Sequence, residues 1–173
     1  GRVLARLHAT LGPGYGWRAD YAFDAVTIPN GWCGDWPDFW ARRRLLPEAG
    51  ELPRPLRAGL EDLAARLPGI LPAHPPASLL HGDLWPGNIL VDAGRITGLI
   101  DPASYYGHSE ADLAMLCLFA RPPAAFWESH GAPAPGWERR CAVYQLWPAI
   151  VHLRLFGGGY RQLVERLLEA AGD

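Results

Sequence analysis

The sequence predicts an α+β fold that is mostly helical and contains one small β-hairpin. Apolar residues recur at helical spacing along most of the chain, and one pair of short apolar runs flanks a tight turn. Helices grouped around a short antiparallel unit are typical of α+β domains rather than of alternating α/β folds. The 173 residues suffice for one hydrophobic core, so we expect a single domain over residues 1–173.

The elements expected in the first half follow from periodicity and from end signals. Asp35 is placed to cap a helix whose first turn contains Pro37, and Pro68 ends the helix after it. Residues 21–35 show turn signals without a clear period, so we expect them to be irregular. The expected helices lie at residues 2–10, 36–46 and 52–67.

The second half begins with a Pro-rich connector, residues 71–77, which leads to two apolar runs separated by a turn at residues 92–94. We expect the apolar residues on both sides of the polar segment 81–88 to form buried strands that hold this segment still. Ser109 is placed to cap a helix, and the glycines at 157–159 interrupt the last helical region. The hairpin is expected at residues 89–91 and 96–100, and the helices at residues 110–119 and 137–170.

The composition excludes several classes of function. The net charge of −2 gives no electrostatic footprint for nucleic acid or an anionic membrane, and no apolar run approaches the length of a bilayer span. The three cysteines are odd in number and have no metal-ligand spacing, which is typical of reduced thiols in a cytoplasmic protein. The basic run Arg42–Arg44 is expected to be a solvated helix face.

Every one of the 16 basic residues is an arginine, and the sequence contains no lysine. Any chemistry that needs a lysine must therefore obtain it from outside this chain. The enrichment in alanine, arginine, glycine and proline also indicates a gene from a GC-rich bacterium.

The segment SLLHGDLWPGNILVD places an aspartate and an asparagine on a short loop between apolar runs. Asn88 follows Asp83 by five positions, and Asp101 lies thirteen positions beyond Asn88. Asparagine and aspartate oxygens suit Mg²⁺, which leaves Asp83 free to accept a proton from a hydroxyl group. The spacing H-x-D-x(4)-N, followed by an aspartate, is that of kinase phosphoryl transfer. We therefore expect a catalytic loop at residues 79–91 and a metal-binding loop at residues 99–104.

Four segments together resemble the C-terminal lobe of the fructosamine kinases, a family that includes fructosamine-3-kinase and ketosamine-3-kinase. That family belongs to the protein-kinase-like phosphotransferases, with the aminoglycoside and choline kinases. The tryptophan after HGDL and the segment DPASYYGHSE distinguish fructosamine kinases within this superfamily, and the resemblance spans essentially the whole chain. The segments are LLHGDLWPGNIL, IDPASYYGHSEADLAM, IPNGWCGDWPDFW and HLRLFGGGY.

The resemblance implies ATP and Mg²⁺ as cofactors and a role for each residue of the motif. By this resemblance Asp83 is the catalytic base, and Asn88 and Asp101 hold Mg²⁺. Trp85 would stack on the sugar of the substrate, and His152 would line the same pocket. The substrate would be a ketosamine, which is a glycated amine, either as a small molecule or on a glycated protein.

His81 and Asp112 are expected to support the catalytic loop. In kinase-like loops this histidine packs and hydrogen-bonds locally, although it could be taken for a base. Asp112 matches the helix aspartate that supports the loop backbone in the superfamily. Two alternatives stay open: Trp85 as a hydrophobic plug rather than a stacking platform, and His152 as a core histidine. Taken singly, the aspartates and the asparagine of the motif are also explained as turn residues at strand ends.

Complete members of the family carry an N-terminal β lobe with a phosphate-covering loop and an ATP-binding lysine. Residue 1 falls where that lobe should already have ended, and the missing lysine agrees, so the resemblance implies that the N-terminal lobe is absent. The expected fold is therefore the mostly helical C-terminal lobe of a protein-kinase-like fold. The chain alone is expected to be inactive or nearly so, and the surface left by the missing lobe is expected to favour self-association.

Two other functions remain open. The motif HGDLWPGN also fits a small-molecule kinase of the aminoglycoside or choline kinase type, although DPASYYGHSE argues against it. The chain can also be a non-catalytic remnant that binds a sugar amine without chemistry. The retained Asp83, Asn88 and Asp101 argue against this third interpretation, because drift would be free to erase a costly polar cluster.

Overall fold

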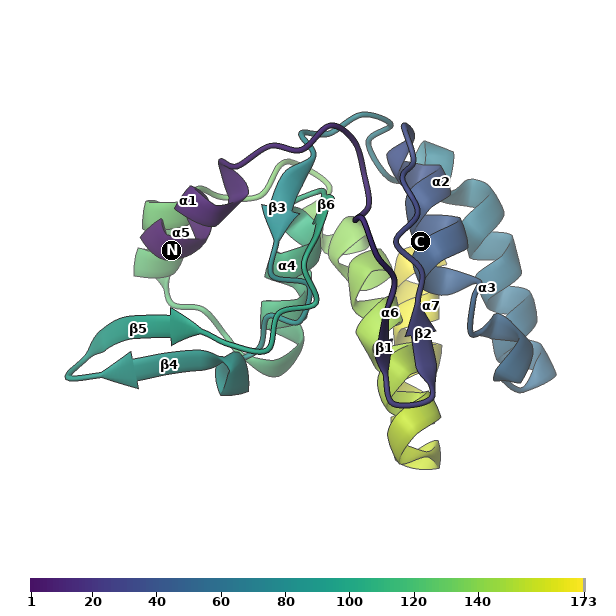
Figure 1. The fold of residues 1–173 in the computed structure, drawn as a ribbon. Coiled ribbons are helices and arrows are strands. Elements are labelled where there is room, and N and C mark those ends of the chain that lie inside the picture. Colours follow the sequence, from purple (N-terminus) through teal and green to yellow (C-terminus); the bar gives the residue numbers. More distant parts are fainter. Residues whose placement is uncertain (173) are drawn as a thin grey trace.

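The computed structural model describes residues 1–172 and confirms a mixture of helices and small antiparallel strands (Figure 1). None of the helices in this range has the length and apolar character that crossing a bilayer requires. The helices are α1 (Arg2–His8), α2 (Trp36–Trp40), α3 (Arg54–Arg66), α4 (Glu110–Phe119), α5 (Ala124–His130), α6 (Trp137–Phe156) and α7 (Arg161–Gly172). The strands are β1 (Tyr21–Phe23), β2 (Val26–Ile28), β3 (Ser78–Leu80), β4 (Ile89–Asp92), β5 (Arg95–Leu99) and β6 (Tyr105–Gly107).

The strands pair as three two-stranded antiparallel sheets, β1–β2, β3–β6 and β4–β5. The β4–β5 hairpin confirms the prediction. The expectation that residues 21–35 are irregular is wrong, because β1 and β2 pair within that segment. The β3–β6 pairing, with Ser78 opposite Gly107, was not predicted, nor was helix α5. The strands that were not predicted are β1, β2 and β6, and their three residues each are too few to show an alternating pattern.

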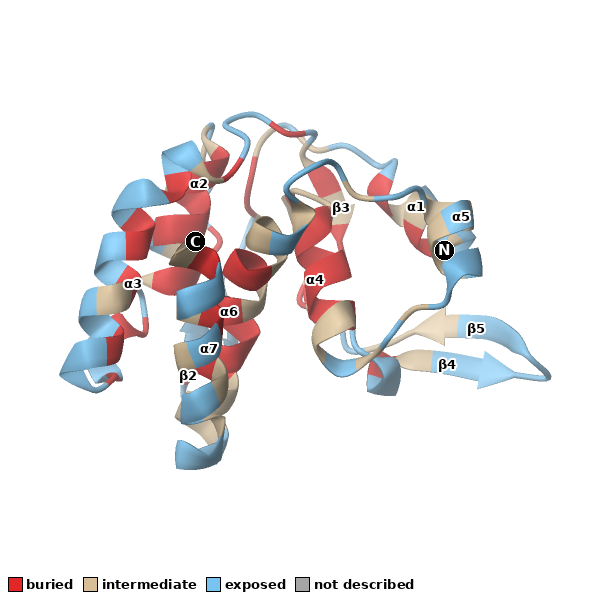
Figure 2. Cartoon of the chain, turned by 180° about the vertical axis from the view of Figure 1, so that it is seen from behind, coloured by how far each residue is buried: buried red, intermediate tan, exposed pale blue. Residues whose placement is uncertain are grey.

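The main core lies among α2, α3, α6 and α7, whose buried faces meet in Figure 2. Helix α2 begins as predicted, because the side chain of Asp35 accepts a hydrogen bond from the backbone N–H of Asp38 at 2.8 Å. The chain then widens into a π-helical turn over Ala41–Leu45 instead of continuing as an α-helix. Helix α6 also packs against α4, and this contact joins the core to the loops that follow β3 and β5.

The apolar residues on the two sides of the polar loop are not both buried, which corrects the prediction. On the β3 side Leu80 is 0% exposed, whereas the β4–β5 hairpin projects away from the helices (Figure 1). Leu90, Val91 and Ile96 of the hairpin are 46%, 62% and 44% exposed. The hairpin makes its principal contacts between its own two strands. The loop is therefore held by β3 and by polar contacts rather than by buried strands on both sides.

The expectation of a solvated face at Arg42–Arg44 is wrong for Arg44, which is 1% exposed. Successive helical residues point about 100° apart, so three in a row cannot all face solvent on a packed helix. Burial among aromatic rings lowers the pKa of the Arg44 guanidinium. The rings beside the guanidinium are those of Tyr105 at 4.2 Å, Phe39 at 4.9 Å and Trp147 at 5.1 Å.

We expect Arg44→Ala to lower the free energy of unfolding by about 3 kcal/mol, because it opens a cavity and leaves oxygens of Pro29 and Asn30 without their donor. Urea denaturation followed by tryptophan fluorescence measures the change. The matched control is Arg42→Ala, whose side chain is 70% exposed and pairs with Asp38, and it should change stability by less than about 0.5 kcal/mol. Equal effects of the two substitutions would contradict the buried role of Arg44.

Candidate active site

The candidate site is built on the loop between β3 and β4, residues 81–88. Gly82 has a φ of +81°, and a Cβ atom there would lie 2.1 Å from the carbonyl oxygen of Ala103. Only glycine permits both this conformation and this approach. A Cβ atom at Gly87 would lie 2.2 Å from the ring of Trp85. Gly82 therefore lets the loop approach the backbone of Ala103, and Gly87 leaves room for the Trp85 ring to fold over the loop.

A buried carboxylate on α4 holds the start of this loop. Asp112 is 1% exposed and accepts hydrogen bonds from the backbone N–H groups of His81 at 2.7 Å and Gly82 at 2.9 Å. Its carboxylate also lies 3.2 Å from Nε2 of His8 on α1. His8 was not anticipated, because a histidine on a short amphipathic helix gives no sequence signal for a partner 104 positions away.

His8 extends this set of contacts to α5. Its Nδ1 atom lies 3.1 Å from Nε2 of His130, whose Nδ1 atom lies 3.2 Å from the carbonyl oxygen of Gly131. Burial lowers the pKa of His130, which favours its neutral ring. Through His8, the buried carboxylate on α4 is therefore connected to helix α5 as well as to helix α1.

His81 is 3% exposed and uses both ring nitrogens locally. Its Nε2 atom donates to the carbonyl oxygen of Ile100 at 3.0 Å, and its Nδ1 atom accepts from the backbone N–H of Asp83 at 3.3 Å. These partners assign the neutral ring with its proton on Nε2. Since neither nitrogen is left free for a substrate, the contacts favour a supporting role for His81 over that of a base.

Asp83 and Asn88 are brought together by two hydrogen bonds. Nδ2 of Asn88 donates to the carbonyl oxygen of Asp83 at 2.8 Å and to its Oδ2 atom at 2.9 Å. Burial raises the pKa of Asp83 above its ordinary value of 3.8, and the hydrogen bond from Asn88 opposes part of this rise. Oδ1 of Asp83 and Oδ1 of Asn88 are left for other partners.

Asp101 is held near Asp83 and Asn88 by the residue before it. The backbone N–H of Ile100 donates to the carbonyl oxygen of Asn88 at 3.1 Å. Asp101 has a φ of +51° and an exposed side chain. Within residues 1–172 neither its carboxylate nor Oδ1 of Asn88 has a hydrogen-bonding partner, and no group of three or more His, Cys, Asp and Glu side chains forms a metal site. Two free oxygen donors on adjoining loops fit Mg²⁺, which completes its shell with water and phosphate oxygens.

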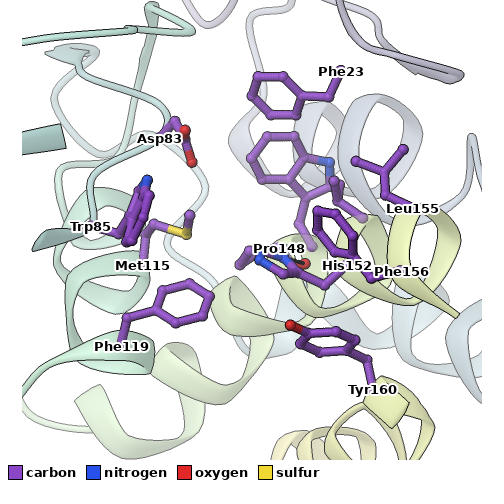
Figure 3. Close-up of a pocket in the computed structure, with 12 residues that line it drawn as sticks. Phe23, Asp83, Trp85, Met115, Phe119, Pro148, His152, Leu155, Phe156 and Tyr160 are labelled. Carbon is purple, nitrogen blue, oxygen red and sulfur yellow. Dashed lines mark hydrogen bonds between the residues drawn. The ribbon is translucent and has the colours of Figure 1, made fainter. Parts of the chain in front are cut away.

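Asp83 also lies at one end of a cavity of about 460 Å³ between the loop, α4 and α6 (Figure 3). Trp85, which is 41% exposed, lines the same cavity, and its ring lies 6.3 Å from the ring of Phe119. His152 lies on the α6 side, where its Nδ1 atom donates to the carbonyl oxygen of Pro148 at 2.7 Å. The structure therefore brings the two residues expected to bind substrate to the cavity of the expected base.

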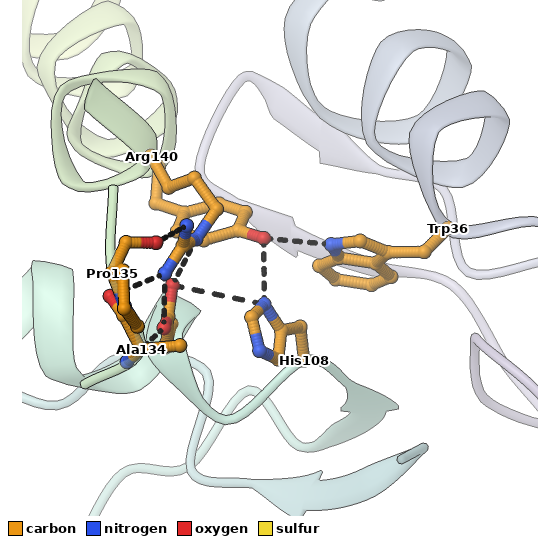
Figure 4. A network of polar contacts seen from close by, with 7 residues as sticks. Trp36, His108, Ala134, Pro135 and Arg140 are labelled. Carbon is orange, nitrogen blue, oxygen red and sulfur yellow. Dashed lines mark hydrogen bonds and ion pairs between the residues drawn. The ribbon is translucent and has the colours of Figure 1, made fainter. Parts of the chain in front are cut away.

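A polar network fixes the start of α4, which carries Asp112 (Figure 4). Glu110 is 4% exposed and pairs with Arg140 of α6 at 2.7 Å. The hydroxyl of Tyr144 accepts from Nε1 of Trp36 at 2.9 Å and lies 2.8 Å from Nδ1 of His108. Burial lowers the pKa of His108 to about 4, so its neutral ring accepts the hydroxyl proton of Tyr144. The segment GHSE thereby connects α2, α4 and α6.

A family model described as fructosamine kinase matches residues 1–171. Among the curated relatives, a Synechocystis protein assigned as a ketoamine kinase is 37% identical over 177 residues, and mouse ketosamine-3-kinase is 38% identical over 163 residues. These matches cover 98% and 82% of this chain. They cover 60% and 50% of the two relatives, so the chain spans little more than half of their length.

Two crystal structures share the fold. A Thermobifida fusca protein assigned as a fructosamine-3-kinase superposes with a TM-score of 0.87 at 34% identity, over 97% of this chain and 62% of that one. A Haemophilus somnus protein with the same assignment superposes with a TM-score of 0.82 at 25% identity, over 97% of this chain and 60% of that one.

We expect Asp112→Asn to lower the free energy of unfolding by about 3 kcal/mol, because the amide loses the charge that His8 faces and one of two acceptors for backbone N–H groups. Amide hydrogen exchange at His81 and Gly82 should also accelerate. The matched control is Asp92→Asn at the exposed end of β4, which should change stability by less than about 0.5 kcal/mol. Similar stability and exchange in the two variants would show that Asp112 does not hold the loop.

Proposed function

Because this chain belongs to the fructosamine kinase family, we propose that it supplies the acceptor side of a kinase for ketosamines. The reaction is transfer of the γ-phosphoryl group of ATP to a sugar hydroxyl, which destabilises the adduct so that the amine is released. The observation that carries this proposal is the placement of Asp83, a partly buried carboxylate tied to Asn88 at one end of an aromatic cavity.

Asp83 is the proposed general base. Its Oδ2 atom is held by Asn88, while its other carboxylate oxygen is free to accept the proton of the attacking hydroxyl. Burial raises the pKa of Asp83, which makes its carboxylate a stronger base than that of an exposed aspartate. A protonated Asp83 cannot accept the proton, so activity falls as the pH falls through this raised pKa.

Asn88 and Asp101 are the proposed holders of Mg²⁺, which when bound neutralises charge on the phosphate oxygens. The chain's own contribution is to place the two oxygen donors. The backbone hydrogen bond from Ile100 to Asn88 keeps their loops adjacent. Because the side-chain nitrogen of Asn88 is engaged by Asp83, its oxygen is directed away from that carboxylate.

Trp85 and His152 are the proposed contacts to the sugar. The apolar C–H faces of a sugar ring pack on an aromatic ring, and the exposed part of the Trp85 ring offers such a surface. The ring packs over Gly87 while the residue stays partly exposed, which favours a stacking platform over a hydrophobic plug. His152 faces the same cavity from α6.

The nucleotide side of the cleft is proposed to be completed by groups outside residues 1–173. Kinase phosphoryl transfer uses a lysine on the ATP phosphates, and this sequence contains none. We therefore propose that residues 1–173 alone have little or no kinase activity.

ATP-dependent phosphorylation should be very weak with residues 1–173 alone and should appear when the chain is fused to the part of the Synechocystis relative that it does not cover. The acceptor is 1-butylamino-1-deoxyfructose, and phosphorus NMR identifies the phosphorylated position. Equal turnover by the two proteins would contradict the need for an outside lysine. A fusion that unfolds cooperatively yet phosphorylates no ketosamine would contradict the proposed function itself.

In the same fusion, we expect Asp83→Asn to lower kcat by about 10²–10⁴-fold with little change in the KM of the acceptor, because the amide cannot accept a proton. The kcat/KM of the parent fusion should fall towards acid pH with a midpoint above 3.8, and the variant should lack this dependence. Asp92→Asn, at the exposed end of β4, is the control and should keep both constants. An unchanged kcat in the Asp83 variant would exclude its role as the base.

A further inference from the structure

Aromatic rings continue from Trp85 to the far end of the cavity (Figure 3). Each ring contacts the next, and the rings come from the loop, from α4, from α6 and from the segment that joins α6 to α7. The centroid distances are 6.3 Å for Trp85–Phe119, 5.3 Å for Phe119–His152, 5.4 Å for His152–Phe156, 5.0 Å for His152–Tyr160 and 6.1 Å for Phe156–Tyr160.

The cavity carries almost no charge for its size. Within residues 1–172, Asp83 is the one carboxylate among the lining side chains, and none of them is an arginine. The remaining walls are apolar or aromatic, with Met115 and Leu155 among them. A ligand that places charge at the far end of this cavity therefore meets ring faces rather than ionised side chains.

A ketosamine has a polar end and a cationic end, which match the carboxylate end and the aromatic end of the cavity. Its sugar carries hydroxyls, and its secondary amine is protonated at neutral pH. If a hydroxyl approaches Asp83 and the sugar stacks on Trp85, the ammonium falls among the rings beyond Trp85. A desolvated ammonium within about 6 Å of aromatic ring centroids is stabilised by cation–π attraction.

We propose that Phe119, His152, Phe156 and Tyr160 form a subsite for the amine end of the ketosamine, with the ammonium held by ring faces and not by a carboxylate. This inference rests on the proposed function. His152 adds one directed contact, because its Nδ1 atom donates to the carbonyl oxygen of Pro148 and leaves Nε2 as the ring atom for a polar contact with the amine.

The subsite selects by charge. An adduct of an alkylamine, such as a lysine side chain, brings one cation and an apolar substituent, which the cavity matches. An adduct of an α-amino acid also brings a carboxylate, for which the lining offers no arginine. An adduct of a polyamine brings further cations, for which no carboxylate is left once Asp83 faces the hydroxyl. The proposed substrate class is therefore ketosamines of alkylamines.

Calorimetric binding to residues 1–173 at pH 7 tests the proposal with three ligands. They are 1-butylamino-1-deoxyfructose, its uncharged ether isostere 1-O-butylfructose, and the fructose adduct of glycine. The amine should bind about 3- to 30-fold more tightly than the ether, and the glycine adduct more weakly than the amine. Equal binding of amine and ether would overturn the subsite while leaving sugar recognition intact. Absence of binding by all three would overturn the proposed function, and the subsite with it.

Substitutions test which side chains cause the preference for the amine over the ether. Phe156→Leu and Tyr160→Leu each remove one ring and should shrink the preference for amine over ether towards unity, with a smaller change in ether affinity. Trp32→Leu, at an exposed tryptophan outside the cavity, is the matched control and should keep the preference. Urea denaturation of each variant confirms that it is folded. A full preference in both ring variants would overturn the subsite.

Discussion

The buried carboxylate of Asp112 is the constraint on which the site depends. Removing an ionised carboxylate from water costs several kcal/mol unless donors surround it. Here the donors are two backbone N–H groups of the loop and an imidazole of α1, so the groups that compensate the charge are also the groups that become fixed. This carboxylate thereby joins the start of the loop, helix α1 and helix α4. The ion pair between Glu110 and Arg140 in turn holds α4 against α6.

The proposed reacting groups are positioned mainly by hydrogen bonds between side chains and the backbone. His81 ties the loop to the residue before Asp101, and Gly82 lets the loop approach the segment beyond it. The side chains that face the cavity therefore need few supporting contacts of their own. This arrangement suits phosphoryl transfer, in which the protein contributes position and electrostatics rather than covalent chemistry. It also explains how an exposed hairpin can follow the loop without loosening it.

The sequence predicted the features that depend on local rules. Neighbouring residues determine the helix start at the Asp35 cap, the β4–β5 turn and the close spacing of Asp83 with Asn88. It missed the features that depend on distant partners. Arg44 is buried because rings from three separate segments surround it, and His8 contacts α4 and α5 across most of the chain. The exposure of the hairpin was missed because apolar strands have the same pattern whether or not another element covers them.

The guanidinium groups of Arg44 and Arg140 have a chemical consequence beyond packing. Reducing sugars condense with primary amines, and a guanidinium is not one. Since residues 1–173 contain no lysine, the cations that hold the core and the start of α4 cannot be converted into ketosamines. Glycation of lysine side chains, which neutral sugars cause in other proteins, therefore has no target within this fold.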